Sequence, residues 1–243
     1  MLTRYQIALE ADRPVRLTPE WGYRLYSALL EQAPADFSRR VHEDGVTPVS
    51  QFLMGGQRPV WTVSLLGEAC ETELAPLLAG LKELSLEREG LQLNVVDRVC
   101  DRVEDVENLF RMAKDSSGCR RLHIHTPAAF KSRGQYQTLP TPELLVGNLV
   151  RRWNGCITEC PIEDTDGEGV AALAAGLRWR EFSLHSGVYR LKGNPVPGFT
   201  GVLEVERKLS GFHSQLADAL LLFSAYSGIG IKTALGMGGV TVE

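Results

Sequence analysis

Apolar and polar residues along the first hundred positions follow spacings that predict strands and helices in alternation. Apolar side chains recur at every second position over residues 2–10, as expected of a strand with one buried face. Pro19 suits the first turn of a helix, and the leucines between positions 74 and 81 stand at helical spacing. The predicted elements are a strand at 2–10, helices at 19–30 and 34–42, strands at 49–53 and 60–66, a helix at 71–84 and a strand at 91–99. This βαββαβ order is typical of a ferredoxin-like domain, an antiparallel sheet with both helices on one face.

The second half repeats the pattern. We predict strands at 121–126, 178–191 and 201–208, helices at 142–153 and 211–224, and a closing strand at 234–242. A polar stretch at 114–118 is the expected boundary between the halves. The predicted fold class is α+β: two tandem ferredoxin-like domains at 1–118 and 119–243, the second elaborated by a long insertion and a C-terminal glycine-rich loop.

Composition limits the kinds of partner and cofactor. The chain has 243 residues and a formal net charge of −4, so a nucleic-acid site has to be a local basic patch. Its five cysteines include no C-x-x-C pair, which argues against a disulfide framework or a zinc ribbon and fits the reducing cytoplasm. No apolar run reaches eighteen residues and no signal-peptide core is present. We therefore expect no membrane association, no metal and no cofactor.

The last eighteen residues place five glycines around one lysine. Without a Cβ, a glycine can adopt positive φ and point its amide at an anionic oxygen, and Lys232 adds a cation at the same place. A helix precedes this segment and a strand follows it, which is the reverse of the order in a dinucleotide-binding fingerprint. Two interpretations stay open: a cradle for a phosphate backbone, or a helix C-cap and bulged turn into the closing strand.

The glycines have a definite arrangement: Gly228-Ile-Gly230, a spacer of five residues, then Gly236-Met-Gly238. This tail resembles that of the repeat-associated RNA-binding (RAMP) superfamily of CRISPR systems, whose double ferredoxin-like members end in such a loop. Residues 25–29 with 40–43, and residues 130–145, look like the branch of endoribonucleases that cuts CRISPR precursor transcripts. The resemblance implies a metal-independent nuclease that binds the CRISPR repeat of precursor crRNA. The alternative is a non-catalytic RNA-binding subunit of a CRISPR effector complex.

The resemblance also implies the roles of individual residues. His42 matches the catalytic histidine and Tyr26 its partner, in a reaction in which a ribose 2′-oxygen attacks its own phosphate to leave a 2′,3′-cyclic phosphate and a 5′-hydroxyl. An imidazole titrates near neutral pH and can exchange protons with these oxygens. Family members that use a lysine carry it just after the histidine, but residues 43–50 contain none. Without the resemblance, His42 is better explained as a surface or helix-end residue, and Tyr26 can be a core tyrosine whose hydroxyl reaches solvent.

Several cations and glycines are therefore candidate RNA-binding residues. Residues 130–136 offer two cations and two aromatic rings, which suits either a clamp on phosphates and an unpaired base or an ordinary surface loop. The pair Arg151-Arg152 is interpreted as a complement to a helix dipole. The predicted RNA-binding set is Arg39, Arg40, Lys131, Arg133, Gly228, Gly230, Lys232, Gly236 and Gly238. A homodimer and an association with effector-complex subunits are both left open.

Overall fold

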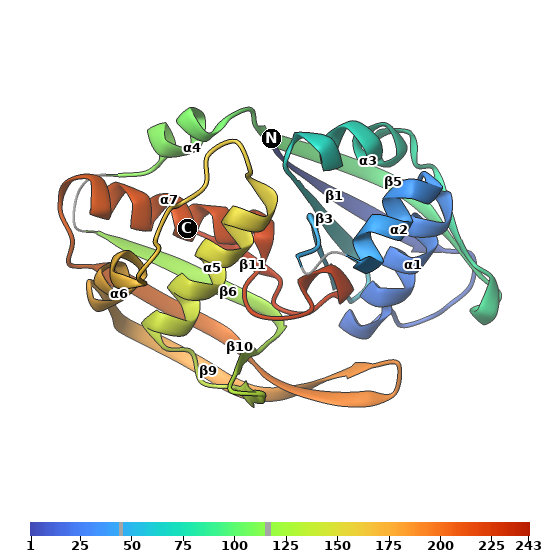
Figure 1. The fold of residues 1–243 in the computed structure, drawn as a ribbon. Coiled ribbons are helices and arrows are strands. Elements are labelled where there is room, and N and C mark those ends of the chain that lie inside the picture. Colours follow the sequence, from blue (N-terminus) through green and yellow to red (C-terminus); the bar gives the residue numbers. More distant parts are fainter. Residues whose placement is uncertain (44–45, 115–117) are drawn as a thin grey trace.

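Two antiparallel sheets lie beside each other in the computed structural model (Figure 1). It describes residues 1–43, 46–114 and 118–243, with only the backbone of residues 40–43. The first sheet has the strand order β2-β3-β1-β5-β4, and the second has the order β11-β6-β10-β9. The fold is α+β with tandem ferredoxin-like domains, as predicted. The division at residue 118 stays a prediction.

The first sheet and its helices follow the predicted order closely. The elements are β1 (Leu2–Ala11), a 3-10 turn η1 (Pro19–Trp21), α1 (Gly22–Gln32), α2 (Ala35–Glu43), β2 (Val49–Met54), β3 (Val60–Leu66), α3 (Glu68–Gly80), β4 (Glu83–Leu86), a second 3-10 turn η2 (Glu87–Glu89) and β5 (Leu91–Val103). The helix predicted at 71–84 is wrong at its end. It stops at Gly80, because residues 83–86 alternate exposed and buried side chains and pair with β5 as an additional edge strand.

The second sheet carries the elaboration expected of it. Its elements are α4 (Val106–Met112), β6 (Cys119–Ala128), β7 (Phe130–Ser132), β8 (Gln135–Gln137), α5 (Pro142–Cys156), α6 (Glu168–Ala175), β9 (Leu177–Leu191), β10 (Asn194–Arg207), α7 (Gly211–Ser227), a 3-10 turn η3 (Thr233–Leu235) and β11 (Val240–Val242). The closing strand predicted at 234–242 is mostly wrong. Positive φ angles at Gly236 and Gly238 interrupt the extended backbone, so pairing with β6 begins only at Val240.

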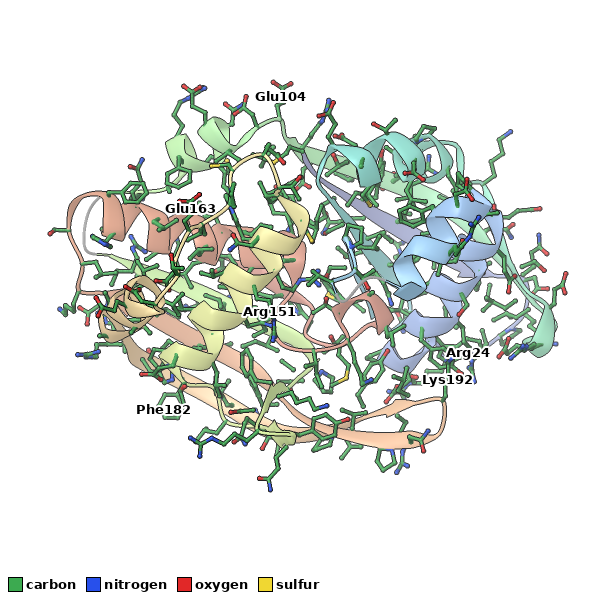
Figure 2. All side chains as sticks on the ribbon, in the orientation of Figure 1. Arg24, Glu104, Arg151, Glu163, Phe182 and Lys192 are labelled. Carbon is green, nitrogen blue, oxygen red and sulfur yellow. The ribbon has the colours of Figure 1, made fainter. Side chains whose placement is uncertain are left out.

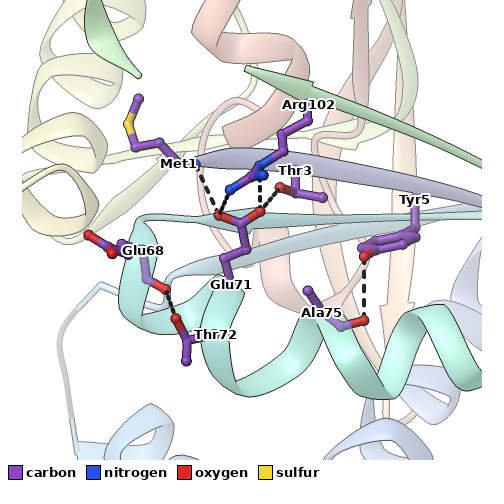
Figure 3. A network of polar contacts seen from close by, with 8 residues as sticks. All are labelled: Met1, Thr3, Tyr5, Glu68, Glu71, Thr72, Ala75 and Arg102. Atoms are coloured by element: carbon purple, nitrogen blue, oxygen red, sulfur yellow. Dashed lines mark hydrogen bonds and ion pairs between the residues drawn. The ribbon is translucent and has the colours of Figure 1, made fainter. Parts of the chain in front are cut away.

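The N-terminal strand is fixed to helix α3 by a small polar network (Figure 3). Glu71 accepts hydrogen bonds from the Met1 amino group at 3.0 Å and from the Thr3 hydroxyl at 2.7 Å, and the Arg102 guanidinium lies 2.8 Å away. Partial burial alone raises the pKa of Glu71, but these donors more than reverse that effect and the pKa is lowered. The carboxylate therefore joins β1, β5 and α3.

Hydrophobic contacts continue from one sheet to the other. The core around α5 and α7 includes Leu2, Leu66 and Val103, which belong to strands of the first sheet. Helix α7 contacts strands β1, β2 and β3 as well as β10 and β11. Arg4 of β1 lies 5.0 Å from the centre of the Tyr226 ring of α7. The two halves therefore share buried side chains along α7.

The glycine-rich loop after α7 packs between the two halves. The Gln51 side chain of β2 donates to the carbonyl of Ala234 at 3.0 Å and accepts from the Trp61 indole at 2.9 Å. From the other side, the Tyr189 hydroxyl of β9 lies 2.8 Å from the carbonyl of Leu235. A Cβ at Gly238 would overlap the carbonyl oxygen of Ile229 within the loop. The glycines thus allow a close approach of backbone segments.

This packing predicts a large cost for a single methyl group. Gly238→Ala is expected to lower the free energy of unfolding by about 2 kcal/mol or more, because φ is positive there and the Cβ has no room. The melting temperature should fall by about 5 °C. The matched control is Gly147→Ala in α5, where a Cβ meets nothing within 4 Å and stability should be unchanged or rise by up to about 1 kcal/mol. Equal melting temperatures for Gly238→Ala and wild type would contradict the packing role of the loop.

A second prediction concerns acid stability. His125 of β6 stacks on Phe52 of β2 with ring centres 5.7 Å apart, and burial, then the neighbouring His123, lower its pKa. The unfolded chain therefore binds a proton at His125 more readily than the folded chain, so folded-state stability is lost as pH falls below about 6.5. Melting temperature measured from neutral pH to about pH 5 should fall less for His125→Gln than for wild type. His213→Gln, on the exposed side of α7, controls for the loss of one histidine. A wild-type slope in His125→Gln would refute this assignment.

Candidate functional site

A groove lies between the two halves of the molecule and has a volume of about 490 Å³. Helix α1 lines one side, and helix α5, strand β7 and the glycine-rich loop line the others. Among the described residues that line it, four are cations and none is a carboxylate. The cations are Lys131, Arg151, Arg152 and Lys232. In a chain of net charge −4 this is a local basic site, of the kind that composition required of any nucleic-acid interface.

Helix α5 brings two of these cations to the loop. Asn148, Arg151 and Arg152 are spaced three and four residues apart, so they share one face of the helix. The Asn148 side chain accepts from the Gly230 amide at 2.8 Å and donates to the Gly230 carbonyl at 3.1 Å. One helical turn later, Arg151 projects from α5 near the centre of the molecule (Figure 2). The face of α5 that binds the glycine-rich loop through Asn148 therefore also carries the two arginines.

The glycine amides themselves are engaged within the protein. Gly228 donates to the Ser224 carbonyl, Gly230 to Asn148, Gly236 to the Thr233 carbonyl and Gly238 to the Pro127 carbonyl. These amides do not point at an anion, so the expected cradle of glycine N–H groups is wrong at these four positions. The RNA-binding role of this part of the loop stays a prediction.

The free donors of the loop lie at its middle. Lys232 is exposed, has a φ of 57° and precedes the turn η3. Within the described part of the chain, the amides of Lys232, Thr233 and Ala234 have no hydrogen-bond acceptor. All three residues line the groove. An anion in the groove therefore meets backbone N–H groups and an ammonium group together.

The β7–β8 hairpin supplies a cation and an exposed ring side by side. Lys131 is paired with Tyr136 across the hairpin, which puts both side chains on one face. Arg133 is exposed at the turn, with a φ of 49°. Phe130 is buried and stacks on Phe199, so it is not available to an unpaired base. Of the two aromatic residues expected to stack on a base, the hairpin offers Tyr136 alone.

Tyr26 enters the groove from α1. Its side chain is 3% exposed, and its hydroxyl has no hydrogen-bond partner among the described residues. Burial, with a smaller contribution from Cys70, raises its pKa, so the hydroxyl keeps its proton throughout the neutral range. It can therefore donate a hydrogen bond to an anionic oxygen in the groove.

Three of the predicted site residues, Arg39, Arg40 and His42, lie on α2. Arg39 is exposed on α2 and forms an ion pair with Asp36, one turn earlier. The backbone of His42 lies in the last turn of α2, four residues before the groove-lining segment at 46–47. The side chains of Arg40 and His42 lie outside the described part of the structure.

Arg151 and Arg152 are the site residues that the sequence-based interpretation missed. Their position near a helix C-terminus suggested a dipole complement, but they line the groove instead. The spacing of three and four residues from Asn148 could have placed both arginines at the loop, but only once the hydrogen bonds between Asn148 and Gly230 were known.

Other parts of the described structure offer less. A larger cavity of about 1210 Å³ near α3 and α4 is lined by many acidic residues, among them Glu68, Glu104 and Glu107, and is unsuited to a polyanion. No group of three or more His, Cys, Asp or Glu side chains gathers as a metal site within residues 1–39, 46–114 and 118–243. In the same residues, no helix is long and apolar enough to cross a membrane.

Comparisons with known proteins agree with one another. The model of the family described as CRISPR-associated endoribonuclease Cas6 matches residues 122–240. A CRISPR-associated endoribonuclease Cas6 from Mycobacterium tuberculosis is 29% identical over 251 residues, covering 100% of this chain and 78% of that protein. A second Cas6, from Streptococcus thermophilus, is 24% identical over 239 residues, covering 96% of this chain and 94% of that protein. The chain is similar to these Cas6 endoribonucleases over its whole length.

Solved structures of Cas6 proteins share the fold. A Cas6 product complex has a TM-score of 0.78 at 24% identity, covering 100% of this chain and 99% of the other. Thermus thermophilus Cas6 has a TM-score of 0.73 at 20% identity, with 100% and 98% covered.

The basic groove makes a prediction about binding. Lys232→Ala is expected to weaken binding of a CRISPR repeat RNA and to reduce the slope of log Kd against log salt concentration by about one unit, because one cation no longer displaces a counterion. The measurement is a binding titration at four or five salt concentrations. Lys208→Ala, which removes a cation that is paired with Glu206 beyond the groove, should leave the slope unchanged. Equal changes in both variants would contradict a role for the groove.

Proposed function

We propose that this protein is a metal-independent endoribonuclease that binds the CRISPR repeat of precursor crRNA and cuts within it. The observation that carries the proposal is the groove, which four cations and Tyr26 line with no described carboxylate. Such a site attracts and holds a phosphodiester. Similarity to proteins described as Cas6 endoribonucleases supports an RNA phosphodiester as the ligand.

The proposed reaction is an internal transesterification. The ribose 2′-oxygen attacks the adjacent phosphorus, a P–O2′ bond forms and the P–O5′ bond breaks, leaving a 2′,3′-cyclic phosphate and a 5′-hydroxyl. His42 is proposed to exchange protons with these oxygens: one proton leaves the 2′-hydroxyl and one reaches the departing 5′-oxygen. No water or metal enters this balance. The position of His42 in the last turn of α2, just before the segment at 46–47 that lines the groove, is compatible with this role.

Tyr26 is proposed to donate a hydrogen bond to a non-bridging phosphate oxygen. Negative charge builds up on these oxygens in the transition state, and a fixed donor that is already desolvated stabilises it without reorganisation. Because burial raises the Tyr26 pKa, the hydroxyl remains a donor through the neutral and mildly alkaline range.

Lys131, Arg133, Lys232 and Arg39 are proposed to hold the RNA backbone around the cut. The first three lie on the β7–β8 hairpin and the glycine-rich loop, and Arg39 lies on α2. Tyr136, exposed beside Lys131, is placed to stack on an unpaired base.

The second candidate function is that of a non-catalytic RNA-binding subunit of a CRISPR effector complex. The absence of a lysine from residues 43–50 favours it, because the charge on the phosphate then needs another cation. Both functions use the same groove, and cleavage separates them. Association with effector subunits and homodimerisation stay predictions.

Cleavage of a labelled repeat RNA in excess chelator tests the proposal. Wild type should cut once and leave a 2′,3′-cyclic phosphate, and a 2′-deoxy nucleotide at the cut should block the reaction. His42→Ala should lower the single-turnover rate by a factor of about 100 or more, since a general acid–base contribution is about 100- to 10,000-fold. Tyr26→Phe should lower it by a factor of about 10 to 100 with little change in Kd.

Correctly folded Gly147→Ala protein serves as the control, because that substitution leaves the groove residues in place. Tight binding of the repeat without cleavage by wild type would reject the nuclease and leave the RNA-binding subunit.

A further inference from the structure

Arg152 is a buried cation, and two of its guanidinium nitrogens have no hydrogen-bond partner among the described residues. Its side chain is 7% exposed, and its Nε and Nη2 atoms are buried and donate to no acceptor among the described residues. Nε and Nη2 form one edge of the guanidinium, which carries two parallel N–H bonds. That edge is the one that matches two oxygens of a phosphate.

Three other buried or half-buried arginines of this protein, Arg4, Arg120 and Arg207, are paired with carboxylates. Arg207, which is 1% exposed, lies 2.5 Å from Asp218, and Arg120 binds the same carboxylate through two nitrogens at 2.9 and 2.7 Å. Arg4 is bound by Asp101 in the same manner. Arg152 departs from this pattern. Burial lowers the pKa of Arg152, and neighbouring Arg151 lowers it further; Cys156 acts in the opposite direction without reversing the shift.

An uncompensated buried charge of this kind destabilises the folded protein. Buried polar groups are satisfied in almost all cases, and an exception calls for a role outside folding. Arg152 forms part of the wall of the groove, together with Tyr26, Lys232 and the free amides of the loop. Tyr26 lines this groove from α1 and Arg152 lines it from α5, and each has buried polar atoms without a hydrogen-bond partner among the described residues. Two unsatisfied groups from opposite halves of the chain thus meet at one site.

We propose that Arg152 is a catalytic residue, the cation that binds the phosphate at the cut and stabilises the charge that develops on it. The inference deepens the nuclease proposed above and rests on it. It identifies the cation that residues 43–50 do not supply. A phosphate in the groove gives Arg152 the anionic partner that the free protein lacks.

The exposed cations of the groove have a different role from that of Arg152. Lys131, Arg151 and Lys232 are exposed to solvent, where water and salt weaken their effect on a nearby charge. They contribute to affinity for the RNA backbone. Arg152 acts from a desolvated wall, where the same charge has a stronger effect and needs no reorganisation as the transition state forms.

The test compares Arg152→Met with Arg151→Met. In Arg152→Met, the single-turnover cleavage rate at saturating enzyme should fall by a factor of about 100 to 1000, as for loss of one preorganised donor. Its Kd for a 2′-deoxy repeat RNA should change less than about tenfold. Arg151→Met should mainly weaken binding, and its cleavage rate at saturating enzyme should fall far less than that of Arg152→Met.

Melting temperature separates catalysis from folding. Because Arg152 Nε and Nη2 have no hydrogen-bond partner among the described residues, Arg152→Met should melt at the wild-type temperature or above it. An arginine that only supports the fold would instead lower the melting temperature and leave the cleavage rate of the folded fraction intact. Arg152→Ala supplies a second readout: millimolar guanidinium chloride should restore part of its cleavage, and sodium chloride at the same concentration should not.

The outcomes are distinguishable from failure of the proposed function. If wild type cleaves and folded Arg152→Met cleaves at the same rate, Arg152 has no role at the phosphate and the inference is overturned. If wild type binds the repeat but does not cleave it, the nuclease proposal fails, and the inference falls with it.

Discussion

The close contact of the glycine-rich loop with both halves of the chain is the constraint on which the structure depends. Gln51 of β2 binds the loop from one half, and Tyr189 of β9 and Asn148 of α5 bind it from the other. Glycines at 228, 230, 236 and 238 let the backbone adopt positive φ and approach these partners. Because the loop forms one wall of the groove, the contacts that hold the halves together also fix the site.

The hydrogen-bond donors of the loop fall into two groups. The amides of Gly228, Gly230, Gly236 and Gly238 form hydrogen bonds within the protein and fix the shape of the loop. Residues 232–234 line the groove, and their amides have no acceptor among the described residues. Helix α5 contributes twice on one face, with Asn148 for the loop and Arg152 for the wall. A chain of net negative charge thereby gathers four cations in one small space.

Much of the fold could be predicted from the sequence, because each half has strands and helices with clear apolar periodicity. The strands at 2–11 and 60–66 and the helix at 142–156 are long and regular enough to be evident. The edge strand β4 was missed because four residues carry too little periodicity, and the closing strand was predicted too long because glycine dihedral angles are set by tertiary contacts. Tyr26 and Lys232 were predicted from motifs and lie in the groove. The role of Arg152 could not be predicted, because the sequence does not show that its guanidinium is buried in the groove wall without a hydrogen-bond partner at Nε and Nη2 among the described residues.

A crystal structure with an uncleavable 2′-deoxy repeat RNA tests the assignment of this groove most directly. The expected result places the phosphate at the cut between α1 and α5, within hydrogen-bond distance of the Arg152 guanidinium and the Tyr26 hydroxyl, with Lys232 beside the RNA backbone. A complex in which that phosphate lies outside the groove, with Arg152 still buried and unpartnered, would contradict the assignment.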